Sequence, residues 1–295
     1  MGTDGAADTA AATARCPVCG AAGRLYFRHP VCGIHRCPDC GDLFADYRIP
    51  SDHVGTIYGD GYFEGGGAGY PGYHLDREIL IETGRRYGRL AARHHAPGSI
   101  LDVGAAAGYI LKGYQETGWR GRGIEPNPRM AARARSDSGV EVGVGTLEDY
   151  ADERRYDLVS IIQVAAHFRD LPRAFANAAR LVAPGGLLLV ETWNADSKTA
   201  RFWGRRWHEF SPPSVLHWFT PGSLARLVGR SGLVEIARGR PKKRLSGAHA
   251  RSILTHAVEG SAALSLFKPL TALIPARLAI PYPAEDLFWA LYRKG

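Results

Sequence analysis

All five cysteines of this 295-residue chain lie within residues 16–40, and four of them form two C-x2-C pairs. The pairs are Cys16 with Cys19, in CPVCG, and Cys37 with Cys40, in CPDCG. Two such turns can place four thiolates around one tetrahedral ion, and the glycine after each pair allows the tight turn. The spacing predicts a structural zinc site, because four thiolates leave no open coordination position. Two disulfides are the alternative, which a reducing cytoplasm disfavours.

A second group of residues is suited to binding a nucleoside. SILDVGAAAGYIL (99–111) predicts a short buried strand, a tight turn from Gly104 to Gly108, and the start of a helix. Such a turn lets a ligand approach the backbone and the helix N-terminus. Glu125 ends the next strand, where a carboxylate can accept both hydroxyls of a ribose. No lysine directly follows the turn, which excludes a P-loop.

Alternating strands and helices must position these residues. Helical spacing is expected over 74–95, 109–117, 129–136 and from 172. Strands are expected at 100–103, 120–125, within 140–150, within 155–168, after the Pro-Gly-Gly turn of 184–186, from 233, and at 286–295, the last two pairing antiparallel. This order predicts an α/β fold with a doubly wound, mostly parallel, seven-stranded Rossmann-like sheet.

The series resembles class I S-adenosylmethionine (SAM)-dependent methyltransferases. The matching motifs are DVGAAAG (102–108), Glu125, YDLVSIIQVAAH (156–167) and LVAPGGLLLVETWN (181–194). The chain is most similar to a branch with an N-terminal zinc ribbon, a Y-x3-YF segment (Tyr58, Tyr62, Phe63), and further motifs at 193–201 and 217–227. The resemblance covers roughly 16–236 and implies SAM as methyl donor and a structural zinc ion.

The resemblance also implies roles for single residues. It places Asp102, Gly104, Ala106 and Gly108 in the turn under the methionine part of SAM, with Ala106 replacing the usual second glycine. Glu125 would hold the ribose. Around the rest of the cofactor it implies Thr146, Leu147 and Glu148 beside the adenine, Gln163 near the methionine amine, and Tyr62. The glutamate that often precedes the histidine of this family is Ala166 here.

Two histidines are candidate bases for the transfer. A hydroxyl or acidic carbon that attacks a methyl group must lose its proton, and histidine is the usual acceptor near neutral pH. His167 follows the strand expected beside the methyl-bearing end of SAM, and His217 lies in SVLHWFT. The alternatives are that His167 caps the next helix and His217 packs against Trp218.

The stretch RFWGRRWHEFSPPSVLHWF (201–219) combines aromatic rings with arginines. It suits an acceptor pocket, in which rings stack on a planar or sugar substrate and arginine holds an anion. A surface that stacks nucleic-acid bases and plain packing of a cap on the sheet are the alternatives. The resemblance favours the acceptor pocket.

The expected domain organisation has five parts. It comprises a disordered tail (1–14), the zinc ribbon (15–50), an aromatic glycine-rich connector (51–75), the methyltransferase domain (76–295), and within that domain an insert (241–285). The connector is either a lid over the ligand or a segment whose rings pack the ribbon against the main domain. The insert contains an apolar stretch that covers the sheet edge or pocket or makes weak contact with a membrane surface. The sequence contains no run of 18 apolar residues, so no transmembrane helix is expected. A cytoplasmic location is expected.

Charge narrows the partners. The net charge is +8, and residues 201–250 alone carry that excess. The ribbon segment is neutral, so a small-molecule acceptor is expected as the partner instead of a nucleic acid. The acceptor is expected to be a sugar or other secondary metabolite in natural product biosynthesis, and to be methylated on oxygen or carbon. An RNA methyltransferase that grips phosphates through 201–250 and a non-enzymatic SAM-binding module are the alternatives. The sequence does not indicate an oligomeric state.

Overall fold

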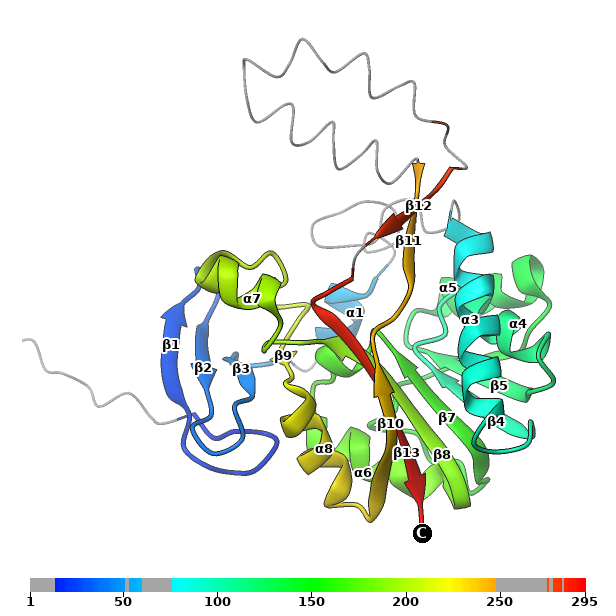
Figure 1. Cartoon of the computed structure of the whole chain (residues 1–295), viewed down its shortest axis with the longest axis horizontal. Helices are drawn as coiled ribbons and strands as arrows, with labels where there is room; N and C mark the ends of the chain where they lie inside the picture. The colour runs from blue at the N-terminus through cyan, green and yellow to red at the C-terminus, as the bar shows by residue number, and fades with distance from the viewer. Residues whose placement is uncertain (1–13, 51–52, 60–75, 248–274, 276–277, 283) are drawn as a thin grey trace, which may run out of the picture.

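A seven-stranded sheet with the order β10-β13-β8-β7-β4-β5-β6 forms the centre of the protein (Figure 1). The computed structural model describes residues 14–50, 53–59, 76–247, 275, 278–282 and 284–295. The strands are β4 (Ser99–Val103), β5 (Arg120–Glu125), β6 (Val142–Val144), β7 (Tyr156–Ile162), β8 (Val182–Trp193), β10 (Leu233–Gly239) and β13 (Leu287–Lys294). Strands β8, β7, β4, β5 and β6 are parallel, and β13 runs antiparallel to both β8 and β10. The predicted doubly wound sheet and its antiparallel last pair are confirmed.

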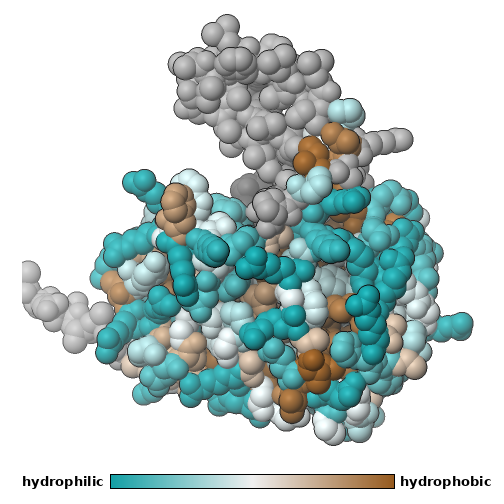
Figure 2. All heavy atoms as spheres, viewed as in Figure 1, coloured by the Kyte–Doolittle hydropathy of each residue, from teal (hydrophilic) through white to brown (hydrophobic). Residues whose placement is uncertain are grey.

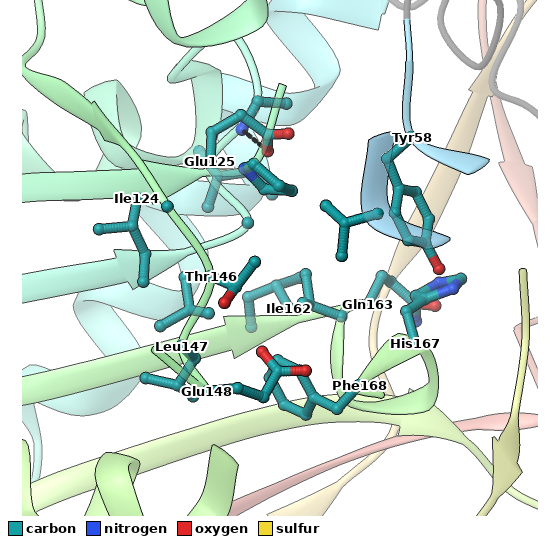
Figure 3. Close-up of a pocket in the computed structure, with 18 of the residues that line it drawn as sticks. Tyr58, Ile124, Glu125, Thr146, Leu147, Glu148, Ile162, Gln163, His167 and Phe168 are labelled. Carbon is teal, nitrogen blue, oxygen red and sulfur yellow. Dashed lines mark hydrogen bonds between the residues drawn. The ribbon is translucent and has the colours of Figure 1, made fainter. Parts of the chain in front are cut away.

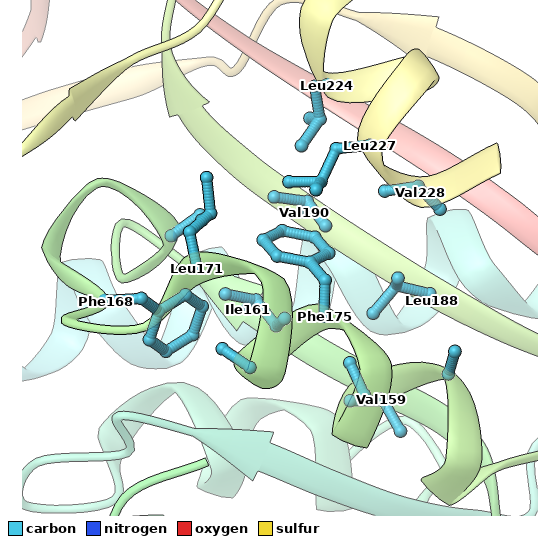
Figure 4. Packing of buried hydrophobic residues seen from close by; sticks show 14 of the residues in the cluster. Val159, Ile161, Phe168, Leu171, Phe175, Leu188, Val190, Leu224, Leu227 and Val228 are labelled. Carbon is cyan, nitrogen blue, oxygen red and sulfur yellow. The ribbon is translucent and has the colours of Figure 1, made fainter. Parts of the chain in front are cut away.

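Helices cover both faces of this sheet. On one face, α3 (Arg77–Ala92) and α4 (Tyr109–Gln115) pack on side chains that include Leu187 and Leu189 of β8. On the other face, α6 (Leu171–Leu181) and α8 (Pro221–Gly229) pack on Leu188 and Val190 (Figure 4). Consecutive strand residues point to opposite faces, so an unbroken apolar run supplies both cores. Each fully buried leucine contributes about 1.5–3 kcal/mol.

Local sequence explains where the helices begin. Asp170 accepts a hydrogen bond from the backbone N–H of Arg173, and Thr220 forms a reciprocal capping box with Ser223 at α8. Asn127 caps α5 (Pro128–Arg133) in the same way. Each cap satisfies an N–H that has no partner inside its helix. The short π-helix η2 (Ala134–Ser138) continues α5, and the 3-10 helix η3 (Ala165–His167) follows β7.

The small N-terminal sheet of the ribbon (15–50) includes a strand from the larger domain. Strands β1 (Arg24–Arg28), β2 (Gly33–Arg36) and β3 (Leu43–Asp46) are antiparallel, and the fourth strand is β9 (His217–Trp218), which pairs with β3. The three strands of residues 15–50 therefore pair with one another, and a strand from outside this segment extends their sheet. A two-residue strand has no hydrophobic periodicity, so the sequence offered no signal for it.

Aromatic packing seals this junction. The ring of Phe210 lies 5.0 Å from that of Phe27 and 4.9 Å from that of Trp218, and Trp207 is buried beside them. No residue of 201–219 lines the cavity at the carboxyl edge of the large sheet, whereas Arg201, Trp207 and Phe210 line a smaller pocket at the junction. The buried rings pack in the junction, and the acceptor pocket expected within 201–219 stays a prediction. Helix α7 (Lys198–Trp203) instead exposes Phe202, at 82%.

Two further segments approach the carboxyl edge of the sheet. One is the single turn α1 (His53–Ile57), from the connector. The other is an antiparallel pair of strands from the expected insert, β11 (Lys243–Ser246) and β12 (Ala279–Tyr282). Three expected features lie outside the described residues: the tail (1–14) up to residue 13, most of the connector with Tyr62, and the apolar stretch of the insert.

The surface is mainly hydrophilic on the face that Figure 2 shows. Among the described residues, no helix combines the length and apolar character needed to cross a membrane.

Candidate active site

A cavity of about 260 Å³ lies at the carboxyl ends of β4, β5 and β7 (Figure 3). Helices α1 and α3 and strand β11 contribute to its wall. Eight of the residues expected at the site line it: Gly104, Ala106, Glu125, Thr146, Leu147, Glu148, Gln163 and His167. Asp102 and Gly108 are not among its lining residues.

The glycine turn after β4 forms part of the cavity wall, through Gly104 and Ala106. Gly104 and Gly108 have positive φ, and a Cβ on Gly104 would meet the side chain of Val164 at 2.4 Å. Ala106, which replaces the usual glycine, also adopts the left-handed region, with φ of 46°. That conformation costs a residue with a Cβ about 1–2 kcal/mol. The backbone N–H groups of Gly104 and Ala105 fix the turn by bonding the Ile124 carbonyl.

Glu125 is held with its carboxylate at the cavity. Oε2 accepts the N–H of Ala106 at 3.0 Å and Oε1 accepts the N–H of Asn127 at 2.9 Å. Burial raises the pKa of Glu125, and the two backbone donors oppose that rise. Each carboxylate oxygen has a second acceptor position, so the group can accept two ribose hydroxyls.

Two other expected carboxyl groups, Glu148 and Asp102, are buried. Glu148 accepts the N–H of Arg169 at 2.9 Å, and burial raises its pKa. Asp102 is buried at the end of β4, and burial raises its pKa to about 7, a rise that a hydrogen bond from Ser160 opposes. Glu148, by contrast, lines the cavity with Thr146 and Leu147.

Gln163 joins a buried network that the sequence did not predict. Its Nε2 donates to Oε1 of Glu191 at 2.8 Å, and its φ of 60° is unusual for a residue with a side chain. Glu191 also accepts hydrogen bonds from the Tyr87 hydroxyl and from Nζ of Lys243, the latter at 2.6 Å. These residues come from four separate elements, so no spacing motif could have revealed them.

His167 is fixed in one tautomer. Its Nδ1 lies 2.7 Å from the carbonyl oxygen of Ser214, which can only accept, so Nδ1 carries the proton. In the neutral ring Nε2 then has the lone pair. Burial lowers the pKa of His167, which keeps the ring neutral at neutral pH; the carbonyls of Ser214 and Gln163 oppose this shift. The Tyr58 ring meets it edge-on at 5.8 Å.

His217 occupies a different position. It lies in β9, buried, and its Nε2 is 2.9 Å from the Phe168 carbonyl oxygen. It is not among the residues that line the described cavity. Burial lowers the pKa of His217 to about 4. The structure thus brings His167 to the cofactor-site residues and uses His217 to join the ribbon sheet to the segment after His167.

The four paired cysteines converge in the ribbon. Their sulfur atoms all lie within 4.8 Å of one another, with Cys16 Sγ 3.6 Å from Cys40 Sγ and Cys19 Sγ 3.4 Å from Cys37 Sγ. Tetrahedral zinc with Zn–S bonds of about 2.3 Å separates its sulfurs by roughly 3.8 Å, whereas a disulfide needs about 2.05 Å. None of the five cysteines forms a disulfide in this structure. The arrangement fits a zinc ion and not two disulfides.

The sequence matches the family described as "Methyltransferase domain" over residues 74–237, more than half of the chain. The chain therefore belongs to this methyltransferase family.

Known relatives agree with this assignment. The chain is 27% identical over 154 residues to a ubiquinone biosynthesis O-methyltransferase of Rhodopseudomonas palustris, which covers 46% of this chain and 61% of that protein. It is 31% identical over 148 residues to the protein of that name from Azorhizobium caulinodans, covering 45% of this chain and 57% of the relative. A SAM-dependent methyltransferase structure from Archaeoglobus fulgidus shares the fold, with a TM-score of 0.50 at 15% identity, covering 74% of this chain and 94% of that one.

The buried histidines predict a pH-dependent stability. Because the folded-state pKa of His217 lies near 4, below the ordinary 6.5, the unfolded chain binds more protons between these values. The free energy of unfolding should therefore fall as pH drops from 7 to 5, by about 2 kcal/mol from His217 alone. His217→Gln keeps a donor for the Phe168 carbonyl without titrating, so urea unfolding should show a weaker pH dependence.

The turn residue His29, between β1 and β2, provides the control. His29→Gln should keep the wild-type pH dependence, and the lowered pKa of His167 should leave some dependence in both variants. An unchanged pH dependence in His217→Gln would contradict the assignment.

Proposed function

We propose that this methyltransferase transfers a methyl group from SAM to oxygen or carbon of a small-molecule acceptor, with His167 as general base. The observation that carries the proposal is that His167, which lies on the cavity wall, has its Nδ1 hydrogen-bonded to the Ser214 carbonyl oxygen, and this leaves the lone pair on Nε2. The acceptor class is a sugar or other secondary metabolite. The names of the curated relatives support an O-methylated small molecule.

The cofactor would span three strands of the sheet. Thr146, Leu147 and Glu148 after β6 would border the adenine, Glu125 on β5 would bind the ribose, and the turn after β4 would hold the methionine part. SAM supplies a methyl group on a positively charged sulfur that leaves as a neutral thioether. The protein contributes chiefly by holding the reacting atoms close and in line.

His167 would supply the proton chemistry. The acceptor proton moves to Nε2 as the freed electron pair attacks the methyl carbon, and the carbon–sulfur bond electrons remain on sulfur. The resulting imidazolium is stabilised by the Ser214 carbonyl oxygen at Nδ1. Because burial lowers its pKa, the ring readily returns this proton to solvent.

We further propose that Cys16, Cys19, Cys37 and Cys40 bind a structural zinc ion, which places the protein in the ribbon-containing branch of the family. The sulfur positions support this assignment. A reducing compartment such as the cytoplasm suits free thiolates.

The test of function is a label-transfer experiment. Purified protein and methyl-labelled SAM are incubated with extract of the source organism, and small molecules, RNA and protein are separated. Label in the small-molecule fraction is expected. Label in RNA would replace the proposal with an RNA methyltransferase, and SAM binding without transfer of label would favour a non-enzymatic module.

Replacing the base should affect turnover and not cofactor binding. Asn can present Nδ2 in place of Nδ1 to Ser214 but has no basic nitrogen, so His167→Asn should lower kcat about 10²–10⁴-fold. Wild-type turnover should lose activity only below pH 6.5, because the pKa of His167 is lowered by burial. The exposed His208 serves as control: His208→Asn should keep wild-type kcat. Full activity of His167→Asn would refute the role.

Zinc binding is tested by metal analysis of paired variants. Mass spectrometry of the native protein should give one zinc per chain, and Cys37→Ser should lose it together with thermal stability. Cys32 lies outside the four-cysteine cluster, so Cys32→Ser should retain zinc. A wild-type chain purified without zinc and unaltered in stability by chelator would contradict the assignment.

A further inference from the structure

Lys243 places a positive charge on the cavity wall. It comes from β11, far along the chain from the family motifs, and its side chain is 24% exposed. Its Nζ lies 2.6 Å from Oε1 of Glu191, a carboxylate with no solvent exposure. An ammonium in such a setting is held in one place, because moving it would leave a buried charge unpaired.

The carboxylate of Glu191 accepts hydrogen bonds from three side chains, and it does not need all three N–H groups of Lys243. It accepts from the Tyr87 hydroxyl and from Gln163 Nε2 in addition to Lys243. An ammonium has three N–H donors, and of the described residues only Glu191 forms an ion pair with this one. Two donors therefore remain for oxygen atoms in the cavity.

The order of strands indicates which ligand meets these donors. Glu125, on β5, and the turn after β4 belong to the cofactor side, and Gln163 and His167 follow β7. Glu191 lies on β8, beyond β7 from the cofactor side, and it anchors Lys243 there. The other cation of the wall, Arg169, belongs to the opposite end, where its backbone bonds Glu148.

We propose that Lys243 binds a carboxylate or phosphate oxygen of the acceptor, so that the substrate is an anionic hydroxy compound. This inference rests on the proposed function and names the substrate class of the same site. Lys243 binds the anionic group, His167 takes the proton of the reacting hydroxyl, and Glu191 is the positioning residue that holds Lys243. The apolar wall around Leu80 and Ile162 strengthens such a charged contact by excluding water.

A matched pair of probes tests the charge preference. Protein saturated with S-adenosylhomocysteine is titrated with 4-hydroxybenzoate and with its uncharged amide, 4-hydroxybenzamide, by ligand-observed NMR. The acid should bind about tenfold more tightly than the amide, as expected for one charge-assisted hydrogen bond. K243M should abolish the preference, and K243R should restore part of it. Arg244, the exposed next residue of β11, is the control: R244M should keep the preference.

The outcomes separate this inference from the function itself. Wild-type protein that binds the acid no better than the amide, or binds neither, overturns it. A K243M variant with weakened S-adenosylhomocysteine binding and an intact preference also overturns it, because Lys243 would then hold the methionine carboxylate of the cofactor. The labelled product of the label-transfer experiment should be retained on an anion exchanger. A labelled product without charge refutes this inference and leaves the proposed function intact. Wild-type protein that neither binds the cofactor nor turns it over refutes the proposed function.

Discussion

The reactive end of the cavity depends on one carbonyl oxygen, that of Ser214. It accepts a hydrogen bond from Nδ1 of His167 at 2.7 Å and another from the Tyr58 hydroxyl at 2.8 Å. A carbonyl oxygen offers two lone pairs and no proton. This single atom therefore sets the tautomer of the imidazole and anchors the ring beside it, joining three segments that are far apart in the sequence.

The position of Ser214 is set in turn by the ribbon. Two residues later, the carbonyl of Leu216 accepts the N–H of Ala45, and its own N–H donates to the carbonyl of Ala166. The chain then continues as β9 beside β3. Backbone hydrogen bonds thus run without interruption from the ribbon to the residue before His167. A segment as short as the ribbon has little core of its own, so a bound metal there would add stiffness to this whole path.

The sequence predicted what depends on local pattern. The parallel strands are continuous apolar runs because both their faces are buried, and the turn from Gly104 and the paired cysteines have fixed spacings. Contacts between elements that are distant in the sequence produce no local pattern, so they could not be predicted. His217 had the right residue type and a plausible position, but its burial in β9 depends on a two-residue pairing with the ribbon. The network of Tyr87, Glu191 and Lys243 was missed for the same reason.

The shared sheet also limits how this chain can be rearranged. Removing the ribbon would leave β9 with unpaired backbone groups and would uncover the rings of Phe210 and Trp218, which now pack against it. An exposed strand edge bordered by apolar side chains is a template for pairing with other chains. A truncated chain would thus be prone to aggregate instead of behaving as a smaller enzyme. A chimera that replaces the ribbon must therefore also replace segment 204–219, which packs against it.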